Sequence, residues 1–341
     1  MPEPWLLRPY REGDEGAILD LFARVFGIKR SLQHWRWQFL DNPCGRLFIH
    51  LAVAPSGRLV GQYAGLPVRM QWDGQERLFV QAVDVMADPE FRGDRSLSGV
   101  FGELLACYIR ECLGPDGAAV GFGFPPLGHL RLGRQQGYVR LHRVEQLVKP
   151  LEAVSPSRWF RPITGWTWVV EEVSAVDGRA DRLWERCRPE LRLAAIRDAR
   201  YLNWRYTRHP EIRYRFFAVK RRFSEAWAGL AVLRVGGEKA TAYLGQGEPV
   251  ASLVDWLVPL SERAVAEALV RRCESAGREA GMTALYAWCR PGSAHWRIFA
   301  ERGFRSEPTP MYLTAVPGID GISVQEAGER WYYTMGDSDL Y

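Results

Sequence analysis

The stretch that decides the fold runs from Gln81 to Cys112. It reads Gln81-Ala-Val-Asp-Val-Met-Ala-Asp-Pro-Glu-Phe-Arg-Gly93, then Asp-Arg-Ser-Leu-Ser-Gly99, then Val100-Phe-Gly-Glu-Leu-Leu-Ala-Cys-Tyr-Ile-Arg-Glu-Cys112. The first part predicts a buried strand that ends at an Asp-Pro pair, and the middle part predicts a polar loop. Apolar residues of the last part recur at helical spacing. The sequence therefore predicts a strand, a loop and a helix in direct succession.

The same signals predict elements on both sides of this stretch. Turn signals at 55–57 and 73–74 separate three apolar runs, which indicates an antiparallel meander. The predicted strands of the first half lie at 5–8, 47–53, 58–70, 78–86, 118–124 and 139–148. One predicted helix follows Asp14, and three more lie at 32–40, 100–112 and 127–136.

Two motifs occur twice at nearly the same offset. Trp37-x-Phe-x3-Pro43 returns as Trp204-x-Tyr-x3-Pro210, an offset of 204 − 37 = 167. Pro125-x3-His-x-Arg-Leu-x4-Gly-Tyr138 returns as Pro291-x3-His-x-Arg-Ile-x4-Gly-Phe304, an offset of 304 − 138 = 166. Half of the chain is about 170 residues, an ordinary domain size. The chain is therefore predicted to hold two copies of one domain.

Composition restricts the function classes. The chain of 341 residues is 47% hydrophobic and 25% charged, without an apolar run long enough for a membrane span. Its six cysteines show no CxxC pairing, which is typical of reduced thiols in a cytosol, so we expect no disulfide and no metal. Basic residues, nearly all arginine, are dispersed among acidic ones at a net charge of +5. A cytoplasmic protein that binds neither nucleic acid nor membrane is expected.

The motifs and the order of elements resemble the GNAT superfamily of acyl-CoA N-acyltransferases, in particular bacterial members with two domains. The resemblance covers most of both halves and is strongest in Asp84-Val-Met-Ala-Asp-Pro-Glu-Phe-Arg-Gly93, which looks like the strand that enters the family's pyrophosphate loop. It implies an α+β fold of two tandem GNAT-like domains, each a mixed, mostly antiparallel sheet flanked by helices. The expected limits are 1–150 for an acyl-CoA-binding domain, 151–315 for a degenerate copy, and 316–341 for a tail that docks near the acceptor cleft.

The loop after the strand suits the pyrophosphate of an acyl-CoA. A helix that begins near Gly99 presents unpaired backbone N–H groups and the positive end of its dipole. Gly93 lets the backbone approach the phosphates. The alternative is a surface loop in which Ser98 caps a helix. The resemblance implies that acetyl-CoA or another acyl-CoA is held by Val85, Met86, Ala87, Arg92, Gly93, Asp94, Arg95, Ser96, Ser98 and Gly99. The second glycine comes later than in the family, at position 99, which implies a longer loop.

Asp84 is the candidate general base, because an attacking amine must lose a proton. The open alternative is a structural aspartate at the end of a buried strand. The family often has a tyrosine general acid where this chain has Gly133 and Phe299, and neither residue can donate a proton.

The second half lacks the loop. The helix start lies 99 − 84 = 15 positions after Asp84, but Ser261 lies only 261 − 255 = 6 positions after Asp255. The connector Trp256-Leu-Val-Pro-Leu260 has no glycine, arginine or hydroxyl. We therefore expect a single working cofactor site, in the first half.

The last eleven residues, Trp331 to Tyr341, carry aromatic side chains to the end. One interpretation is packing of this segment onto the first domain. The other hypothesis is that Asp337, Asp339 or the terminal carboxylate enters the acceptor cleft and binds or deprotonates an amine.

The predicted activity is direct transfer of an acyl group to an amine of a small molecule or amino sugar. The sequence has no nucleophile motif such as Gly-x-Ser-x-Gly that would indicate a covalent intermediate. Two alternatives stay open: a non-catalytic acyl-CoA-binding protein, and an aminoacyl-tRNA-dependent transferase on a related double fold.

Overall fold

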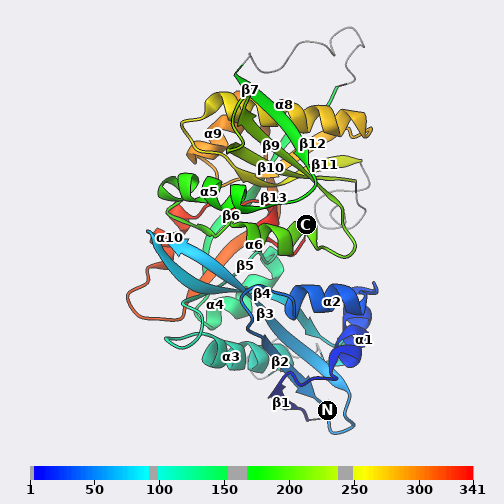
Figure 1. Cartoon of the computed structure of the whole chain (residues 1–341). Coiled ribbons are helices and arrows are strands. Elements are labelled where there is room, and N and C mark those ends of the chain that lie inside the picture. The colour runs from blue at the N-terminus through cyan, green and yellow to red at the C-terminus, as the bar shows by residue number, and fades with distance from the viewer. Residues whose placement is uncertain (1–3, 92–98, 153–166, 237–248, 341) are drawn as a thin grey trace. The chain divides into compact units, whose positions relative to one another are not determined.

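The structure, a computed structural model, describes residues 4–91, 99–152, 167–236 and 249–340 (Figure 1). It divides into two compact units. Unit 1 comprises Met1–Met70, Glu76–His142 and Met311–Glu329, and unit 2 comprises Gln71–Gln75, Arg143–Pro310 and Arg330–Tyr341. This division differs from the expected linear limits, because residues 143–150 fall in unit 2 and residues 311–329 fall in unit 1.

Unit 1 contains a mixed sheet with the strand order β1-β2-β3-β4-β5-β13. Its β1–β2 and β2–β3 pairs are antiparallel, whereas β4 and β5 run parallel. Helix α3 packs against β2 (Figure 1). The elements of the first half are β1 (Leu6–Pro9), α1 (Glu15–Phe26), α2 (Leu32–Phe39), β2 (Phe48–Val53), β3 (Leu59–Trp72), β4 (Gln75–Ala87), η1 (Pro89–Phe91), α3 (Val100–Cys112), β5 (Val120–Gly123), η2 (Leu127–His129), α4 (Leu130–Gln135) and β6 (Val139–Pro150).

Unit 2 repeats the pattern with the strand order β7-β9-β10-β11-β12-β6. Again the first pairs are antiparallel and one pair, β11 with β12, is parallel. The elements of the second half are β7 (Trp168–Val173), α5 (Gly178–Cys187), η4 (Arg188–Glu190), β8 (Leu193–Ala195), α6 (Ala199–Leu202), the π-helical turn η5 (Asn203–Thr207), β9 (Tyr214–Arg221), β10 (Trp227–Val235), β11 (Val250–Leu257), α8 (Arg263–Glu279), β12 (Ala284–Trp288), α9 (Ala294–Glu301), β13 (Arg305–Pro317), α10 (Val324–Arg330) and η6 (Met335–Asp337).

The last strand of each half explains why the units differ from the expected limits. In unit 1 the strand beside β5 is β13, with the antiparallel register Thr314↔Gly123. In unit 2 the strand beside β12 is β6, with the antiparallel register Tyr286↔Val148. Each half of the sequence therefore supplies the closing strand of the other half's sheet.

A glycine lets the central helix of each unit approach its sheet. A Cβ on Gly61 of β3 would lie 2.4 Å from Cγ1 of Val100 on α3, and a Cβ on Gly229 of β10 would lie 2.6 Å from Cγ1 of Val265 on α8. The offsets, 229 − 61 = 168 and 265 − 100 = 165, are close to those of the repeated motifs. The two halves thus share a packing contact that Cβ atoms would prevent.

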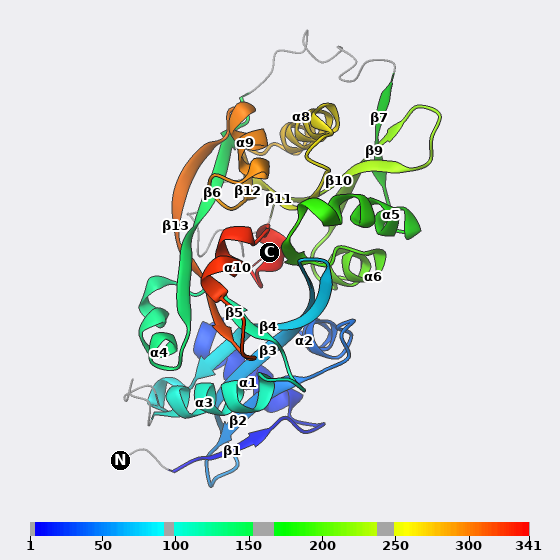
Figure 2. The ribbon, with the colours of Figure 1, turned by 90° about the vertical axis from the view of Figure 1, so that its left-hand side faces the viewer.

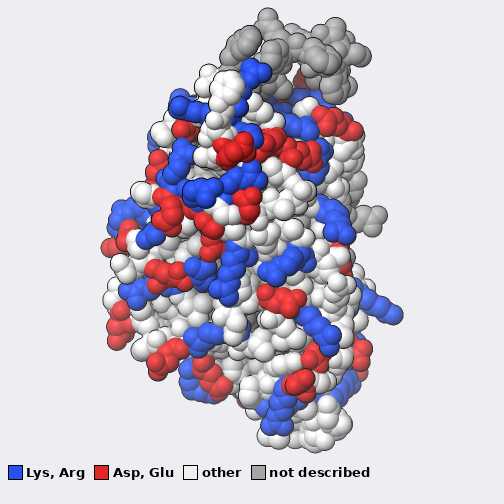
Figure 3. Space-filling view, in the orientation of Figure 1, with Lys and Arg blue, Asp and Glu red and all other residues white. Residues whose placement is uncertain are grey.

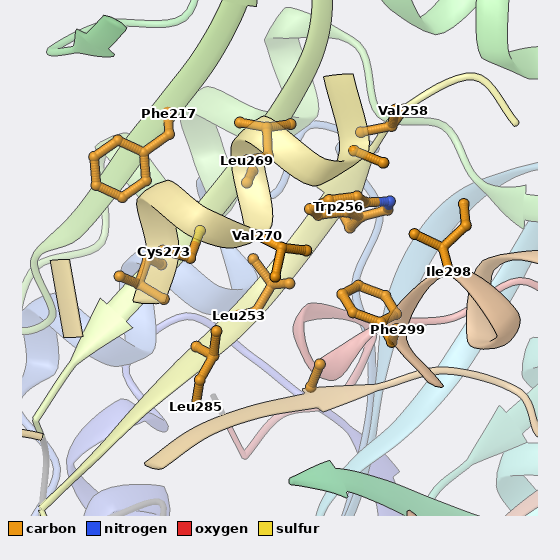
Figure 4. Packing of buried hydrophobic residues seen from close by; sticks show 14 of the residues in the cluster. Phe217, Leu253, Trp256, Val258, Leu269, Val270, Cys273, Leu285, Ile298 and Phe299 are labelled. Carbon is orange, nitrogen blue, oxygen red and sulfur yellow. The ribbon is translucent and has the colours of Figure 1, made fainter. Parts of the chain in front are cut away.

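The core of unit 2 lies between its sheet and two helices. Figure 4 shows Leu269 and Val270 of α8 and Phe299 of α9 packed with Phe217 and Leu253 of the sheet. Helices α8 and α9 lie side by side (Figure 2), joined by ion pairs such as the one between Arg263 and Glu301. In the described part of the chain no helix is long and apolar enough to span a membrane.

On the face that Figure 3 shows, acidic and basic residues are interleaved. Many form ion pairs, as where Arg215 and Arg272 both approach Glu172, at 2.7 and 3.4 Å. On that face the excess of arginine therefore does not form a continuous basic stripe of the kind that nucleic acid binds.

Candidate functional site

The strand that enters the predicted loop is anchored at its end by Asp88. This buried carboxylate accepts hydrogen bonds from Arg58 at 2.7 Å and from Arg24 at 3.0 Å. Burial alone would raise the pKa of Asp88, but the bonds from Arg58, the Glu90 amide and Arg24 hold that pKa below its ordinary value. The Asp88 amide donates to the Val60 carbonyl at 2.8 Å. These contacts fix the point at which the chain leaves β4.

The helix after the loop begins where the sequence predicted. Gly99 is the N-cap residue of α3, in an extended conformation with φ −80° and ψ 164°. The amide of Glu103 donates to the Gly99 carbonyl at 3.0 Å, so the amides of residues 100–102 have no acceptor within the helix. The other predicted loop residues lie outside the described residues: Arg92, Gly93, Asp94, Arg95, Ser96 and Ser98.

Strand β4 continues past its pairing with β5. The parallel register ends at Gln81↔Phe122, whereas β4 runs on to Ala87. Residues 85–87, which are among the predicted acyl-CoA-binding residues, therefore lie beyond the pairing with β5. The backbone also bends here, since Asp84 has a φ of 47°, in the left-handed region that few residues other than glycine adopt. Such a conformation costs about 1–3 kcal/mol and persists only where the surroundings enforce it.

Two contacts hold Asp84 in that conformation. Its carbonyl accepts a hydrogen bond from Gln62 Nε2 at 3.1 Å. Its carboxylate accepts two from the Arg30 guanidinium, one of them to Oδ1 at 3.0 Å. The Arg30 guanidinium also lies 4.0 Å from the centre of the Phe22 ring on α1. Among the described residues Arg30 is the only partner of the Asp84 carboxylate, which is 5% exposed.

An equivalent Arg–Asp ion pair occurs in unit 2. The sequence analysis predicted neither pair. Arg197 Nε donates to Asp255 Oδ1 at 2.7 Å, and both side chains are buried. Arg197 follows Arg30 by 197 − 30 = 167 positions, the offset of the repeated tryptophan motif. Each arginine directly precedes the N-cap residue of a short helix, Ser31 and Asp198. Aligning the halves at this offset would have found both arginines.

In unit 2 further polar groups enclose the pair. Arg197 Nη2 donates to Asp337 Oδ2 at 2.5 Å, and the Tyr206 hydroxyl donates to Asp255 Oδ2 at 2.8 Å. Burial alone would lower the pKa of Arg197, but the attraction of Asp255 and Asp337 raises it well above its ordinary value. The position equivalent to Tyr206 in the first half, 206 − 167 = 39, is Phe39, which has no hydroxyl. The aspartate of unit 1 is therefore less enclosed by polar groups.

The C-terminal segment (residues 331–340) belongs to unit 2. Arg205 donates to the carbonyls of Gly336 and Ser338, at 3.1 and 2.9 Å. A Cβ on Gly336 would lie 2.9 Å from the Val254 carbonyl, so the segment lies directly against β11. Tyr332 of the same segment donates to the Trp256 carbonyl. The interpretation that the segment packs onto the first domain stays a prediction.

The two aspartates of this segment differ in exposure. Asp337 is 8% exposed, and its carboxylate accepts hydrogen bonds from Arg197 and, at 2.7 Å, from the Thr334 amide. Burial raises the pKa of Asp337 above its ordinary value, against the pull of Arg197. Asp339 is exposed. Within unit 2, Asp337 serves as a partner of Arg197.

The connector after β11 is filled by its own side chains. Trp256 and Val258 are buried in the core of unit 2 (Figure 4). Helix α8 begins two residues after the predicted start at Ser261. Ser261 instead lies in a turn closed by a hydrogen bond from the Glu262 amide to the Pro259 carbonyl at 3.0 Å. The corner of unit 2 that corresponds to the predicted phosphate loop is thus packed with apolar groups.

Comparisons with known proteins agree with this geometry. Residues 7–138 match the model of the acetyltransferase (GNAT) domain family. That range includes β4, the predicted loop and α3. A search of curated proteins found no match to the sequence.

Several solved structures share the fold. A probable N-acyltransferase from Enterococcus faecalis has a TM-score of 0.66 at 14% identity, over 92% of this chain and 73% of that one. A GCN5-related N-acetyltransferase from Sphaerobacter thermophilus has a TM-score of 0.52 at 18% identity, over 95% and 99%. The Saccharomyces cerevisiae N-myristoyltransferase with bound myristoyl-CoA and inhibitors has a TM-score of 0.57 at 10% identity, over 95% and 84%. These similarities confirm the expected fold class.

Proposed function

We propose, from the match of residues 7–138 to the model of the GNAT acetyltransferase domain, that the protein transfers an acyl group from an acyl-CoA to an amine. The observation that carries this proposal is the course of β4. Its C-terminal end, which leads towards α3, continues past the last residue that pairs with β5. An extended ligand can lie beside a strand that continues past its neighbour, in the place where the neighbouring strand would have been, and a helix start attracts phosphate.

The donor is proposed to be acetyl-CoA or another acyl-CoA. Its pantetheine would lie along residues 85–87, and its pyrophosphate would bind the amides at the start of α3. The yeast structure of the same fold holds myristoyl-CoA, which supports this class of donor. The proposed binding residues are Val85, Met86, Ala87, Arg92, Gly93, Asp94, Arg95, Ser96, Ser98 and Gly99.

Transfer is proposed to be direct. The amine nitrogen attacks the thioester carbonyl carbon, the new C–N bond forms, and the C–S bond breaks as the thiolate leaves and takes up a proton. Asp84, at the bend of β4, would accept the proton that the amine loses. The repeated Arg–Asp pair supports the alternative, in which Arg30 and Asp84 only shape the strand. A role for Asp337 or Asp339 in binding the amine stays a prediction, with less support for Asp337 because Arg197 holds its carboxylate.

Unit 2 is proposed to be a scaffold that binds no acyl-CoA. Trp256 and Val258 fill the corner where a phosphate would lie, and the C-terminal segment covers β11. The acceptor is proposed to be a small molecule or amino sugar that carries the amine.

The direct test is turnover. Purified protein is mixed with acetyl-CoA or longer acyl-CoAs and a panel of small amines and amino sugars, and the release of free CoA thiol is followed. We expect release that requires both the thioester and one class of amine, without an initial burst. Binding of acyl-CoA without any amine-dependent release would instead support the non-catalytic alternative.

A further inference from the structure

The structure brings three potential metal ligands together in unit 1. They are His50 of β2 and Cys107 and Glu111 of α3, and one ligand atom of each lies within 4.8 Å of the others. Glu111 Oε2 lies 2.8 Å from His50 Nε2, and Glu111 Oε1 accepts a hydrogen bond from Cys107 Sγ at 3.2 Å. Cys107 and Glu111 are four residues apart and so lie on one face of the helix.

We propose that this cluster binds a zinc ion. Imidazole, thiolate and carboxylate are the three ligand types that zinc takes in proteins. A neutral His50 with an ionised Cys107 and Glu111 would balance the double charge of the ion, and the proton of the Cys107 thiol would be released to solvent on binding. Three protein ligands leave a fourth position for water.

The surroundings of the cluster suit this use. His50 and Cys107 are buried, whereas the Glu111 side chain is 44% exposed, which leaves a path from solvent. Cys112 Sγ lies 3.9 Å from His50 Nδ1, so that nitrogen has a sulfur partner and Nε2 would be the nitrogen that binds the ion. Arg110 Nη2 lies 3.0 Å from Glu111 Oε1 and 3.5 Å from Cys107 Sγ. This exposed guanidinium now pairs with the Glu111 carboxylate and would turn to solvent when the ion binds.

The site is separate from the proposed acyl-CoA site. Cys107 follows Gly99 by eight residues, which is about 12 Å along a helix axis. A zinc ion here would fasten α3 to β2 and would not act on the acyl group. The sequence predicted no metal, because the ligands are 111 − 50 = 61 positions apart and form no spacing motif. The proposal does not depend on the proposed function.

Cobalt substitution tests the site. The full chain, reduced and freed of metal with a chelator, is titrated with Co²⁺ while the thiolate-to-cobalt charge-transfer absorbance is recorded, and Zn²⁺ is then added in competition. We expect one ion per chain, a thiolate band, and displacement by Zn²⁺. Cys107→Ser is expected to abolish the band and to weaken Zn²⁺ binding about 100-fold or more, since even outer-shell changes cost up to that much.

Cys44→Ser is the matched control, because Cys44 is a thiol of unit 1 outside the cluster, and it is expected to keep the band and the affinity. Circular dichroism checks that each variant folds. If Cys107→Ser does not fold, His50→Gln serves instead and is expected to lose Zn²⁺ affinity to a similar extent. No thiolate band in the wild type, an unchanged band in Cys107→Ser, unchanged affinity in His50→Gln, or an equal loss in Cys44→Ser would each overturn the proposal.

Discussion

Replacing Arg197 by alanine is expected to lower the free energy of unfolding by about 3–5 kcal/mol, because it leaves buried carboxylates without a countercharge. The Asp255 and Asp337 side chains are only 2% and 8% exposed, so water cannot replace the guanidinium without opening the structure. The loss is a large part of the roughly 5–15 kcal/mol that stabilises a typical protein. Urea denaturation of the variant and the wild type measures it.

Arg263→Ala is the control for this prediction. Arg263 is also in unit 2 and also forms an ion pair, with Glu301 at 3.2 Å, but its side chain is 68% exposed. Exposed pairs contribute about 0–1 kcal/mol, so little change is expected. An equally small change in Arg197→Ala would contradict the view that this buried network holds the C-terminal segment against β11.

The second large effect is expected at Asp84. If Asp84 accepts the proton of the amine, Asp84→Asn should lower kcat by about 10²–10⁴-fold, because an amide of nearly the same size cannot act as a base. The KM for acyl-CoA should stay close to that of the wild type. Steady-state kinetics with the amine identified in the turnover screen gives both quantities.

Asp73→Asn is the matched control. Apart from Asp84, Asp73 is the only non-glycine residue with a positive φ, 44°, in the described part of the chain, and it is exposed and belongs to unit 2. It is expected to retain full activity. Should Asp84→Asn lose stability but keep its kcat, the aspartate would be a positioning residue that shapes β4 with Arg30, and the proton-accepting role would be abandoned.

Local signals in the sequence were sufficient for much of the fold. The helix predicted at 100–112 is α3, and the repeated motifs lie at equivalent places in the two halves. The exchange of β6 and β13 could not be predicted, because nothing local to either strand specifies which sheet it joins. The expected domain limits at 150 and 315 differ from the units for that reason.

The candidate site was predicted less completely. The strand edge at 85–87 and the helix start at Gly99 follow from local sequence, but the partner of Asp84 lies 84 − 30 = 54 positions earlier, beyond any helical or strand spacing. The C-terminal segment posed the same problem, since its aromatic pattern predicts burial but not the surface that buries it. The cluster of His50, Cys107 and Glu111 also depends on the contact between a strand and a distant helix.

Isothermal titration of acetyl-CoA into the protein tests the central claim most directly, which is that unit 1 binds an acyl-CoA through the loop and the start of α3. We expect one site per chain, and at 100 times its Kd the ligand should add about 2.7 kcal/mol to the free energy of unfolding.

Gly93→Asp should abolish binding, because it places a side chain and a negative charge in the predicted phosphate loop. Gly16→Asp, at a helix position where a Cβ meets nothing within 4 Å, should bind as the wild type does. Absence of heat with acetyl-CoA and with longer acyl-CoAs, or unchanged binding by Gly93→Asp, would contradict the claim.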